Sequence, residues 1–389
     1  MDNIIKKIEL TPIHVPFRPQ VRKAMGESEG GLGMAIPADE VWLGGDFVIC
    51  KLFDNEGNVG LGEAFVWLPE TGVSPEQIID SIDKALKLYI LGESPFNTEK
   101  MLYKMDNNVS RNEVAKGLLD IACYDLMGKI LNKPCHDIMG GKIVDELPLC
   151  ALIPLGSPML MKGITRSYKK QGFKTFRIKL GMGPDEDSEM MEAIITKLER
   201  DDRLRVDYNQ AYTPPMAVRA IEAIEEYGID VAEQPVNKDD YMGMVYVQDR
   251  VGVPLMCHEG QFSMRDIITL VELGAIEVIG INTERPGGVT NALKAIDYAK
   301  MNGLGVVLHN QPLGIASAVQ AHIGAARFNS LGHSMELFGD VMMEDDLIKT
   351  ALDYSGGTIK LPTGPGWGVE LDEDALQKYA TGSTLTIEK

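Results

Sequence analysis

Polar residues recur at a nearly constant interval through the last two thirds of this 389-residue chain. Each stands at the end of a short apolar run, and the successive steps between them are 28, 26, 26, 23, 27 and 27 positions. In chain order these residues are Lys179, Asp207, Glu233, Glu259, Asn282, His309 and Glu336. An interval of about 26 residues suits one β/α unit, a buried strand with a returning helix and two loops. We therefore predict a TIM-type (β/α) barrel of seven or eight units over residues 145–360, with these side chains at one mouth.

The first 130 residues follow a different pattern. Apolar and polar residues alternate over 4–17 and 47–65, which predicts antiparallel strands, the second folded into a hairpin at residues 55–58. Helical spacing follows near 75–92, 97–106 and 112–132, whereas the glycine- and charge-rich residues 19–40 predict a loop. We predict an α+β domain over residues 1–130.

The overall charge argues against two classes of partner. The chain has 38 basic and 57 acidic residues, a net charge of −19, so it lacks the basic excess that nucleic acids and anionic membranes attract. No run approaches the roughly 18 consecutive apolar residues of a membrane span. The five cysteines form no CxxC pair, which is typical of a reducing compartment. We expect a cytoplasmic protein.

Three acidic residues end three consecutive predicted strands. Asp207, Glu233 and Glu259 would repel one another at a barrel mouth unless a cation lay between them. Oxygen ligands without cysteine suit a hard divalent ion, Mg²⁺ first and Mn²⁺ second. The alternative is that each acid caps a helix or pairs with a surface lysine.

Candidate bases flank these acids. Arg177 and Lys179 point the same way on the preceding strand, and His309 ends a strand on the far side of the ring. With Glu336 as a further acid, the set suits removal of the proton α to a metal-bound carboxylate, which gives an enediolate that the metal stabilises. A lysine that merely extends its ammonium to solvent, and a structural histidine, are the alternatives.

Several motifs together resemble one known family. "RIKLG", "RVDYNQAY", "AEQP", "MCHEG" and "VLHNQ" occur at spacings similar to those of the mandelate racemase and muconate-lactonizing group of the enolase superfamily. "NEVAKGLLDIACYDLMGKILNKPCHDIMGG" resembles that group's signature between cap and barrel, and "GPGWGVELDEDALQKY" its returning tail. The resemblance implies that residues 1–130 cap the barrel and that a tail of about 362–389 completes this capping domain.

The resemblance also implies roles for individual residues. Asp207, Glu233 and Glu259 correspond to ligands of Mg²⁺, Lys179 to the base on the second strand, and His309 to the histidine on the opposite face. Some relatives ligate the metal one residue earlier than Glu259, a position that is His258 here.

The substrate side of the site shows two departures from the family pattern. Glu336 and Asn209 match substrate-contacting residues, and His258 is a further candidate for the substrate pocket. Arg177 replaces a lysine, which keeps the charge but changes the geometry. Asn282 replaces the aspartate that usually pairs with the opposite-face histidine, so we expect His309 to be a weaker base.

These departures favour one reaction over others. We predict a dehydratase of a hydroxy or sugar acid, in which Lys179 takes the α-proton and His309 helps the hydroxyl leave. The alternative is a racemase, epimerase or cycloisomerase that uses the same intermediate, and a more remote one is a metal-binding barrel without catalysis. The expected partners are a small-molecule carboxylate and, by resemblance, further copies of the chain. Residues 26–33, with Arg22 and Lys23, are predicted to close the site and contact substrate.

Overall fold

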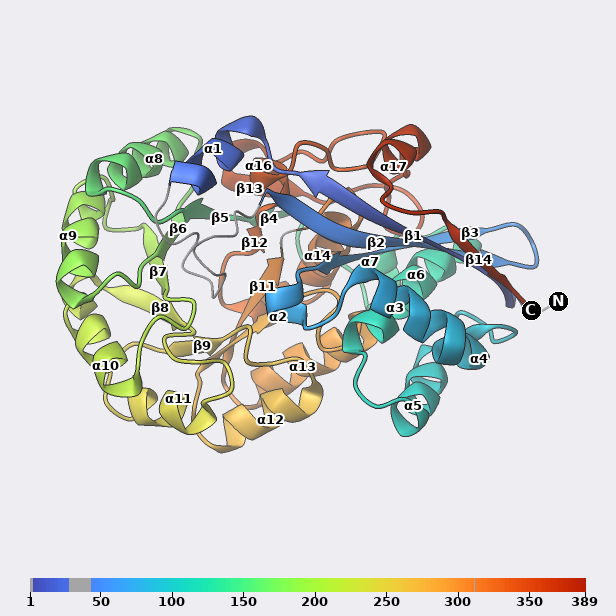
Figure 1. Ribbon diagram of the computed structural model, residues 1–389, viewed down its shortest axis with the longest axis horizontal. Coiled ribbons are helices and arrows are strands. Elements are labelled where there is room, and N and C mark those ends of the chain that lie inside the picture. The colour runs from blue at the N-terminus through green and yellow to red at the C-terminus, as the bar shows by residue number, and fades with distance from the viewer. Residues whose placement is uncertain (1–2, 28–42, 311) are drawn as a thin grey trace.

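The computed structural model describes residues 3–27, 43–310 and 312–389. A four-stranded antiparallel sheet in the order β14-β1-β2-β3 lies beside an eight-stranded parallel sheet that curls into a barrel (Figure 1). This arrangement confirms the predicted fold class. The boundaries at residues 130 and 145 stay a prediction: the first falls in the last turn of helix α6 (Glu113–Leu131) and the second just before strand β4 (Glu146–Pro148).

The antiparallel sheet is the framework of the capping domain. Its strands are β1 (Ile5–Pro16), β2 (Gly44–Asp54), β3 (Val59–Val66) and β14 (Leu385–Glu388). The predicted hairpin is confirmed, because Asp54 Oδ1 accepts the backbone N–H groups of Glu56 at 2.9 Å and Asn58 at 2.8 Å. Strand β14 pairs with β1, so the C-terminal tail completes this sheet as predicted.

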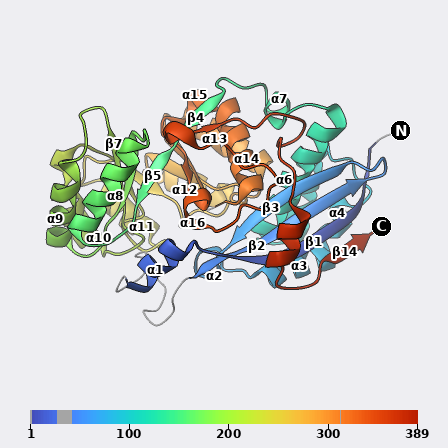
Figure 2. The same cartoon turned by 90° about the horizontal axis from the view of Figure 1, so that it is seen from above.

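Helices cover one face of the cap sheet. They are α3 (Pro75–Ser81), a π-helical turn (Ile82–Leu86), α4 (Lys87–Ile90), α5 (Thr98–Asn108) and α6 (Glu113–Leu131). Helix α6 packs closely on β3 because Gly60 and Gly62 have no side chain there. A Cβ on Gly60 would meet the carbonyl of Ala122, and one on Gly62 the carbonyl of Leu118. Figure 2 shows this helical layer against the sheet, at the opposite end of the molecule from the barrel helices α8 to α11.

The barrel strands follow chain order from β5 to β12. They are β5 (Cys150–Ile153), β6 (Thr175–Lys179), β7 (Arg203–Asp207), β8 (Ile229–Glu233), β9 (Leu255–Cys257), β10 (Val278–Ile281), β11 (Gly305–Asn310) and β12 (Glu336–Leu337). The seam between the first and last strands is joined at Leu149 and Met335, and the Cys150 N–H donates to the Met335 carbonyl at 2.8 Å. Val231, Met256, Val278 and Val307 form a separate apolar cluster on four neighbouring strands.

The outer layer contains one main helix after each of the first seven strands. These are α8 (Pro158–Lys170), α9 (Pro184–Ile195), α10 (Pro214–Glu222), α11 (Tyr241–Gln248), α12 (Met264–Glu272), α13 (Val289–Met301) and α14 (Gly314–Ala326). Among the residues described, no helix combines the length and apolarity that a bilayer crossing needs.

Two buried carboxylates fix the cap to the barrel. Glu63 on β3 accepts the backbone N–H groups of Leu313 at 2.7 Å and Ala316 at 3.0 Å, at the start of α14. Asp120 on α6 accepts from the backbone and the hydroxyl of Thr290, at the start of α13. Carboxylates are favourable at helix N-termini, where backbone N–H groups have no partner within the helix.

The predicted loop over residues 19–40 differs from the structure in its first part. Helix α1 spans Pro19–Glu27, since "PQVRKAMGE" places a proline at the first helical position and good helix formers after it. Of the predicted closing segment, Arg22, Lys23 and residues 26–27 lie in this helix. Residues 28–33 lie outside the described part of the chain.

Candidate active site

The predicted site residues meet at the C-terminal ends of the barrel strands. Lys179, Asp207 and Glu233 end β6, β7 and β8, and the strand register pairs Lys179 with Asp207 and Asp207 with Glu233. His309 and Glu336 are paired across β11 and β12. All five side chains are buried, so they lie inside the mouth of the barrel and not on its rim.

Arg177 and Lys179 pair with the acids on the next two strands. Arg177 donates to both oxygens of Glu233 at 2.7 Å and also contacts Asp207. Lys179 Nζ lies 2.5 Å from Asp207 Oδ2 and also donates to Asn209 Oδ1. These paired cations offset part of the cost of burying two carboxylates.

Glu259 lies on the next wall of the pit, after β9. Its Oε1 accepts from Gln210 Nε2 at 3.1 Å and from Asn209 Nδ2 at 3.5 Å. Its Oε2 is buried, lies 3.6 Å from His258 Nδ1, and has no hydrogen-bond partner among the described residues. Burial raises the pKa of Glu259, but contact with His258 outweighs this effect and leaves the pKa below its ordinary value. A buried carboxylate oxygen without a donor is a suitable ligand for a cation.

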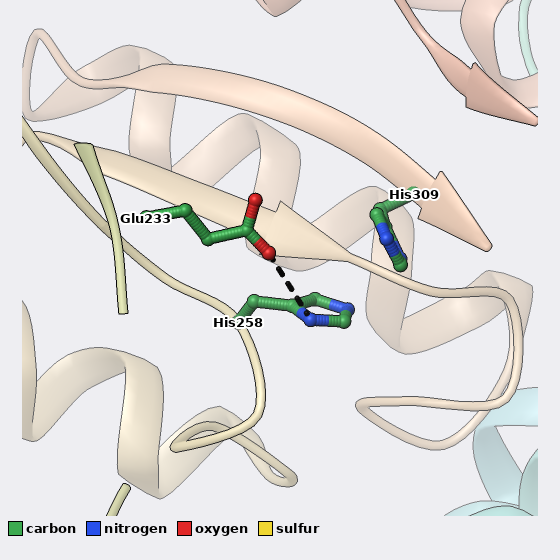
Figure 3. Close-up of side chains that lie close together, drawn as sticks. All are labelled: Glu233, His258 and His309. Carbon is green, nitrogen blue, oxygen red and sulfur yellow. Dashed lines mark ion pairs between the residues drawn. The ribbon is translucent and has the colours of Figure 1, made fainter. Parts of the chain in front are cut away.

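The closest set of metal-type ligands differs from the predicted trio. In the part of the chain that the structure describes, ligand atoms of Glu233, His258 and His309 all lie within 4.8 Å of one another. Figure 3 shows the His258 ring beside the Glu233 carboxylate, with His309 nearby. Asp207 and Glu259 stand outside this set, and the Asp207 carboxylate is turned toward Arg177 and Lys179. The carboxylate-rich donor set nevertheless fits a hard divalent ion, with Glu259 Oε2 as its unpartnered oxygen.

His309 faces the other acid of the pit. Its Nε2 lies 3.6 Å from Glu336 Oε2, and its ring packs edge-on against Phe338. Burial, followed by the neighbouring positive charges of His258 and Arg177, holds the pKa of His309 well below its ordinary value. The imidazole is therefore neutral near pH 7.

Asn282 contacts a different histidine from the one that the resemblance implied. Its Oδ1 lies 2.8 Å from His258 Nε2, whereas the family pattern placed this residue beside His309. Strand β10 pairs with both β9 and β11, so Asn282 lies between His258 and His309, and its side chain turns toward His258. His258 also lies 3.5 Å from Glu233 Oε1, so this predicted substrate residue contacts a predicted metal ligand.

Three charged residues of the site were missed by sequence reasoning. Arg205 Nη1 lies 2.8 Å from Glu336 Oε1, and Arg285 contacts both Glu70 of the cap and, at 3.1 Å, His258 Nε2. Arg205 had a detectable signal, since it precedes Asp207 by two positions on an apolar strand and so faces the same side. Glu70 had no such signal.

A cavity of about 370 Å³ adjoins the site. Thr71 and Arg111 line it from the cap, and Lys238, Glu259 and Phe262 from the loops after the barrel strands. Because Glu259 belongs to both the pit and the cavity, the space between cap and barrel reaches the site from this side.

Comparisons with known proteins agree with this geometry. Residues 160–375 match the model of the enolase C-terminal domain-like family, and residues 44–140 match that of the mandelate racemase / muconate lactonizing enzyme N-terminal domain.

Curated relatives include an N-succinyl-L-Arg/Lys racemase of Bacillus cereus, 30% identical over 85% of this chain and 89% of that protein. A hydrophobic dipeptide epimerase of Enterococcus faecalis is 34% identical over 73% of this chain and 80% of its own.

Solved structures give the same result. That of the N-succinyl Arg/Lys racemase from Bacillus cereus aligns over 100% of both chains with a TM-score of 0.89 and 28% identity. That of a muconate lactonizing enzyme from Pseudomonas fluorescens covers 98% of this chain and 100% of its own, with a TM-score of 0.88 and 25% identity.

Proposed function

The chain belongs to the mandelate racemase and muconate lactonizing group of the enolase superfamily, and from this we propose that it is a racemase or epimerase of a carboxylate substrate. The observation that carries the proposal is the placement of Lys179 and His309 on strands β6 and β11 of one buried mouth, with carboxylates between them. Two groups on different sides of a substrate can remove a proton from one face and return it to the other.

Each residue of the site has its own role in the proposed reaction. Lys179 exchanges a proton with the α-carbon on one face and the neutral imidazole of His309 on the other. Arg177 neutralises Glu233 and Asp207, so the pit is not too negative to admit a carboxylate. When bound by Asp207, Glu233 and Glu259, Mg²⁺ or Mn²⁺ would stabilise the negative charge that develops on the substrate carboxylate.

The relatives favour a different reaction from the one that the sequence analysis predicted first. Those with curated names include racemases, epimerases and cycloisomerases, which support the alternative prediction over the dehydratase. The racemase and the epimerases are named for N-succinylated amino acids and for dipeptides, both of which carry an acylated amino group. We propose substrates of this class.

Proton exchange in D₂O tests the proposal. N-succinyl amino acids and dipeptides are incubated with Mg²⁺ and the protein, and deuterium at the α-carbon is followed by NMR. We expect exchange with inversion, and a loss of at least about 100-fold in Lys179→Ala, since a positioned general base contributes about 10²–10⁴-fold.

Lys174→Ala is the matched control, because this lysine lies one residue before β6 with 62% of its side chain exposed. Unchanged turnover in Lys179→Ala would contradict the assignment of the base. A 2-keto product would favour dehydration.

A further inference from the structure

Glu233, His258 and His309 form a mixed nitrogen and oxygen ligand set within the pit. Their ligand atoms lie within 4.8 Å of one another, and the three residues are only 2%, 4% and 4% exposed. The two imidazole rings have centroids 3.9 Å apart, and Figure 3 shows them on the same side of the Glu233 carboxylate. Three converging side chains from β8, β11 and the end of β9 could therefore hold one ion.

Asn282 orients His258 for this role. Its carbonyl oxygen lies 2.8 Å from His258 Nε2, and His258 Nδ1 faces Glu233 Oε1 at 3.5 Å. A cation at this site would take the place of the Nδ1 proton of His258, while the ring keeps donating its other N–H to a carbonyl oxygen, an arrangement found around metal ligands. Arg285 Nη2 lies farther from the same Nε2, at 3.1 Å, and its charge is paired with Glu70.

The other two members also retain free lone pairs. His309 Nδ1 is buried and has no hydrogen-bond partner in the described part of the chain. Glu233 accepts from Arg177 through both oxygens, but each carboxylate oxygen has a second lone pair. All three side chains can thus bind a cation without losing a hydrogen bond between them.

The charges around this set do not exclude a divalent ion. The cations that contact the pit residues are Arg177, Lys179, Arg205 and Arg285, and the anions are Glu70, Asp207, Glu233, Glu259 and Glu336. These five acidic side chains face four basic ones and His258, so the two signs nearly balance and the surroundings do not repel a divalent ion.

Two imidazoles and one carboxylate select a different class of ion from three carboxylates. Imidazole suits Zn²⁺ and its neighbours, whereas Mg²⁺ prefers oxygen and usually keeps several waters. We propose that Glu233, His258 and His309 bind Zn²⁺ as an inhibitory ion. Glu233 belongs to both ligand sets, so Zn²⁺ here and Mg²⁺ at the three acids exclude each other.

Inhibition follows from the identity of the ligands and rests on the proposed function. An imidazole whose free nitrogen binds a metal cannot take a proton from the α-carbon with that nitrogen. Zn²⁺ therefore removes His309 from proton transfer and draws Glu233 away from the activating ion. The binding itself does not depend on the proposed reaction.

X-ray absorption of the Zn²⁺-loaded full-length protein tests the site directly. The protein is stripped with a chelator and loaded with one equivalent of Zn²⁺, and the fine structure at the zinc edge is recorded. We expect two imidazole nitrogens at about 2.0–2.1 Å. A shell of oxygen atoms alone would overturn the proposal, and this measurement needs no variant.

Calorimetric titration with ZnCl₂ and MgCl₂ adds a test of residue identity. We expect His258→Gln to lower Zn²⁺ affinity by at least about 100-fold and Asn282→Ala by about 10- to 100-fold. Mg²⁺ affinity should change by less than about threefold in His258→Gln, since oxygen ligands hold that ion. His14→Gln is the control, because this histidine is 40% exposed on the cap and pairs with Asp46. Equal loss of Zn²⁺ affinity in His14→Gln, or none in His258→Gln, would overturn the site.

The two proposals fail separately. If Mg²⁺ supports α-proton exchange but bound Zn²⁺ shows no imidazole, the inhibitory site is wrong and the isomerase stands. If bound Zn²⁺ is coordinated by two imidazoles but no carboxylate substrate exchanges its α-proton, the isomerase proposal is wrong and the Zn²⁺ site stands. When both are right, added Zn²⁺ suppresses exchange and excess Mg²⁺ restores it.

Discussion

Arg205 is a buried cation within a barrel strand, and its ion pair supports one wall of the site. It is 2% exposed, and its guanidinium contacts Glu336 Oε1 at 2.8 Å and the Ser334 carbonyl at 2.5 Å. Burial raises the pKa of Glu336, and the charges of Arg177 and Arg205 offset part of this rise. Removal of Arg205 would leave the buried Glu336 with Arg177, 3.3 Å from its Oε2, as its remaining arginine partner.

We therefore expect Arg205→Ala to lower the free energy of unfolding by about 3–5 kcal/mol. Urea denaturation with and without the substitution measures this. Arg203→Ala is the control two residues away, because Arg203 has 70% of its side chain exposed and its pair with Asp230 should contribute less than about 1 kcal/mol. Similar losses in the two variants would contradict the structural role of Arg205.

At the scale of single residues, sequence reasoning identified the residues of the site better than the side chains that they contact. Lys179, Asp207 and Glu233 were recognisable because each ends an apolar run, and the structure brings them together. Asn282 was assigned to His309 and contacts His258, since side-chain rotamers across neighbouring strands decide between two nearby histidines. Glu70 comes from a four-residue helix of the cap, α2 (Leu68–Thr71), which no periodicity relates to the barrel.

Helix starts show which local signals the sequence carries reliably. The sequence Ser263-x-x-Asp266 is typical of a capping box, and α12 has one: Ser263 Oγ accepts the Asp266 N–H at 3.3 Å, and Asp266 Oδ2 accepts the Ser263 N–H at 2.9 Å. Thr213 stands at the corresponding position before Pro214 in α10, but its side chain makes no capping hydrogen bond. The motif predicts the boundary in both helices and the hydrogen bonds in only one.

This difference gives a paired prediction. We expect Ser263→Ala to destabilise the protein by about 1 kcal/mol, because the Asp266 N–H loses its acceptor, Ser263 Oγ. Thr213→Ala should cost less than about 0.5 kcal/mol. Denaturant midpoints for the two variants provide the measurement, and a larger loss for Thr213→Ala would show that the assignment of caps is wrong.

One helix that sequence reasoning missed, although the sequence carries a signal for it, is α1. Glycines and charges over residues 19–40 suggested one loop, yet residues 19–27 hold no glycine before Gly26 and consist mostly of helix formers. The composition of a long window concealed a short helical segment within it.

At the scale of the whole molecule, the strand rhythm was enough to predict a barrel, because a step of about 26 residues leaves few other arrangements. It could not show how the cap, the barrel and the tail are joined. His322 on α14 provides one such junction: its Nδ1 accepts the His136 N–H at 3.1 Å, and its Nε2 donates to the Trp367 carbonyl at 3.1 Å. Its neutral form is fixed by these two bonds.

This junction predicts a loss of stability in acid. Burial, followed by the nearby charge of His136, lowers the pKa of His322 to about 3, whereas an unfolded chain has a histidine pKa of about 6.5. Between these values the unfolded state binds a proton that the folded state does not. The stability that His322 contributes is therefore complete above about pH 6.5 and falls by roughly 1.4 kcal/mol per pH unit toward pH 3.

Urea unfolding between pH 4 and pH 7 compares the wild type with His322→Gln, which keeps a polar side chain and does not titrate. We expect the slope of stability against pH to be smaller in the variant by about one proton. Parallel curves would show that His322 is not the group responsible.

The contact between Glu70 and Arg285 has a consequence for how this architecture can diversify. Glu70 belongs to the cap, Arg285 to the loop after β10, and Arg285 touches the histidine that Asn282 orients. A cap taken from a relative would bring its own residue to position 70. The buried guanidinium of Arg285 would then face that residue in place of Glu70. We therefore expect chimeras of this protein to need both residues of the pair from the same parent, so the exchange should be designed around Glu70 and Arg285 rather than at the linker alone.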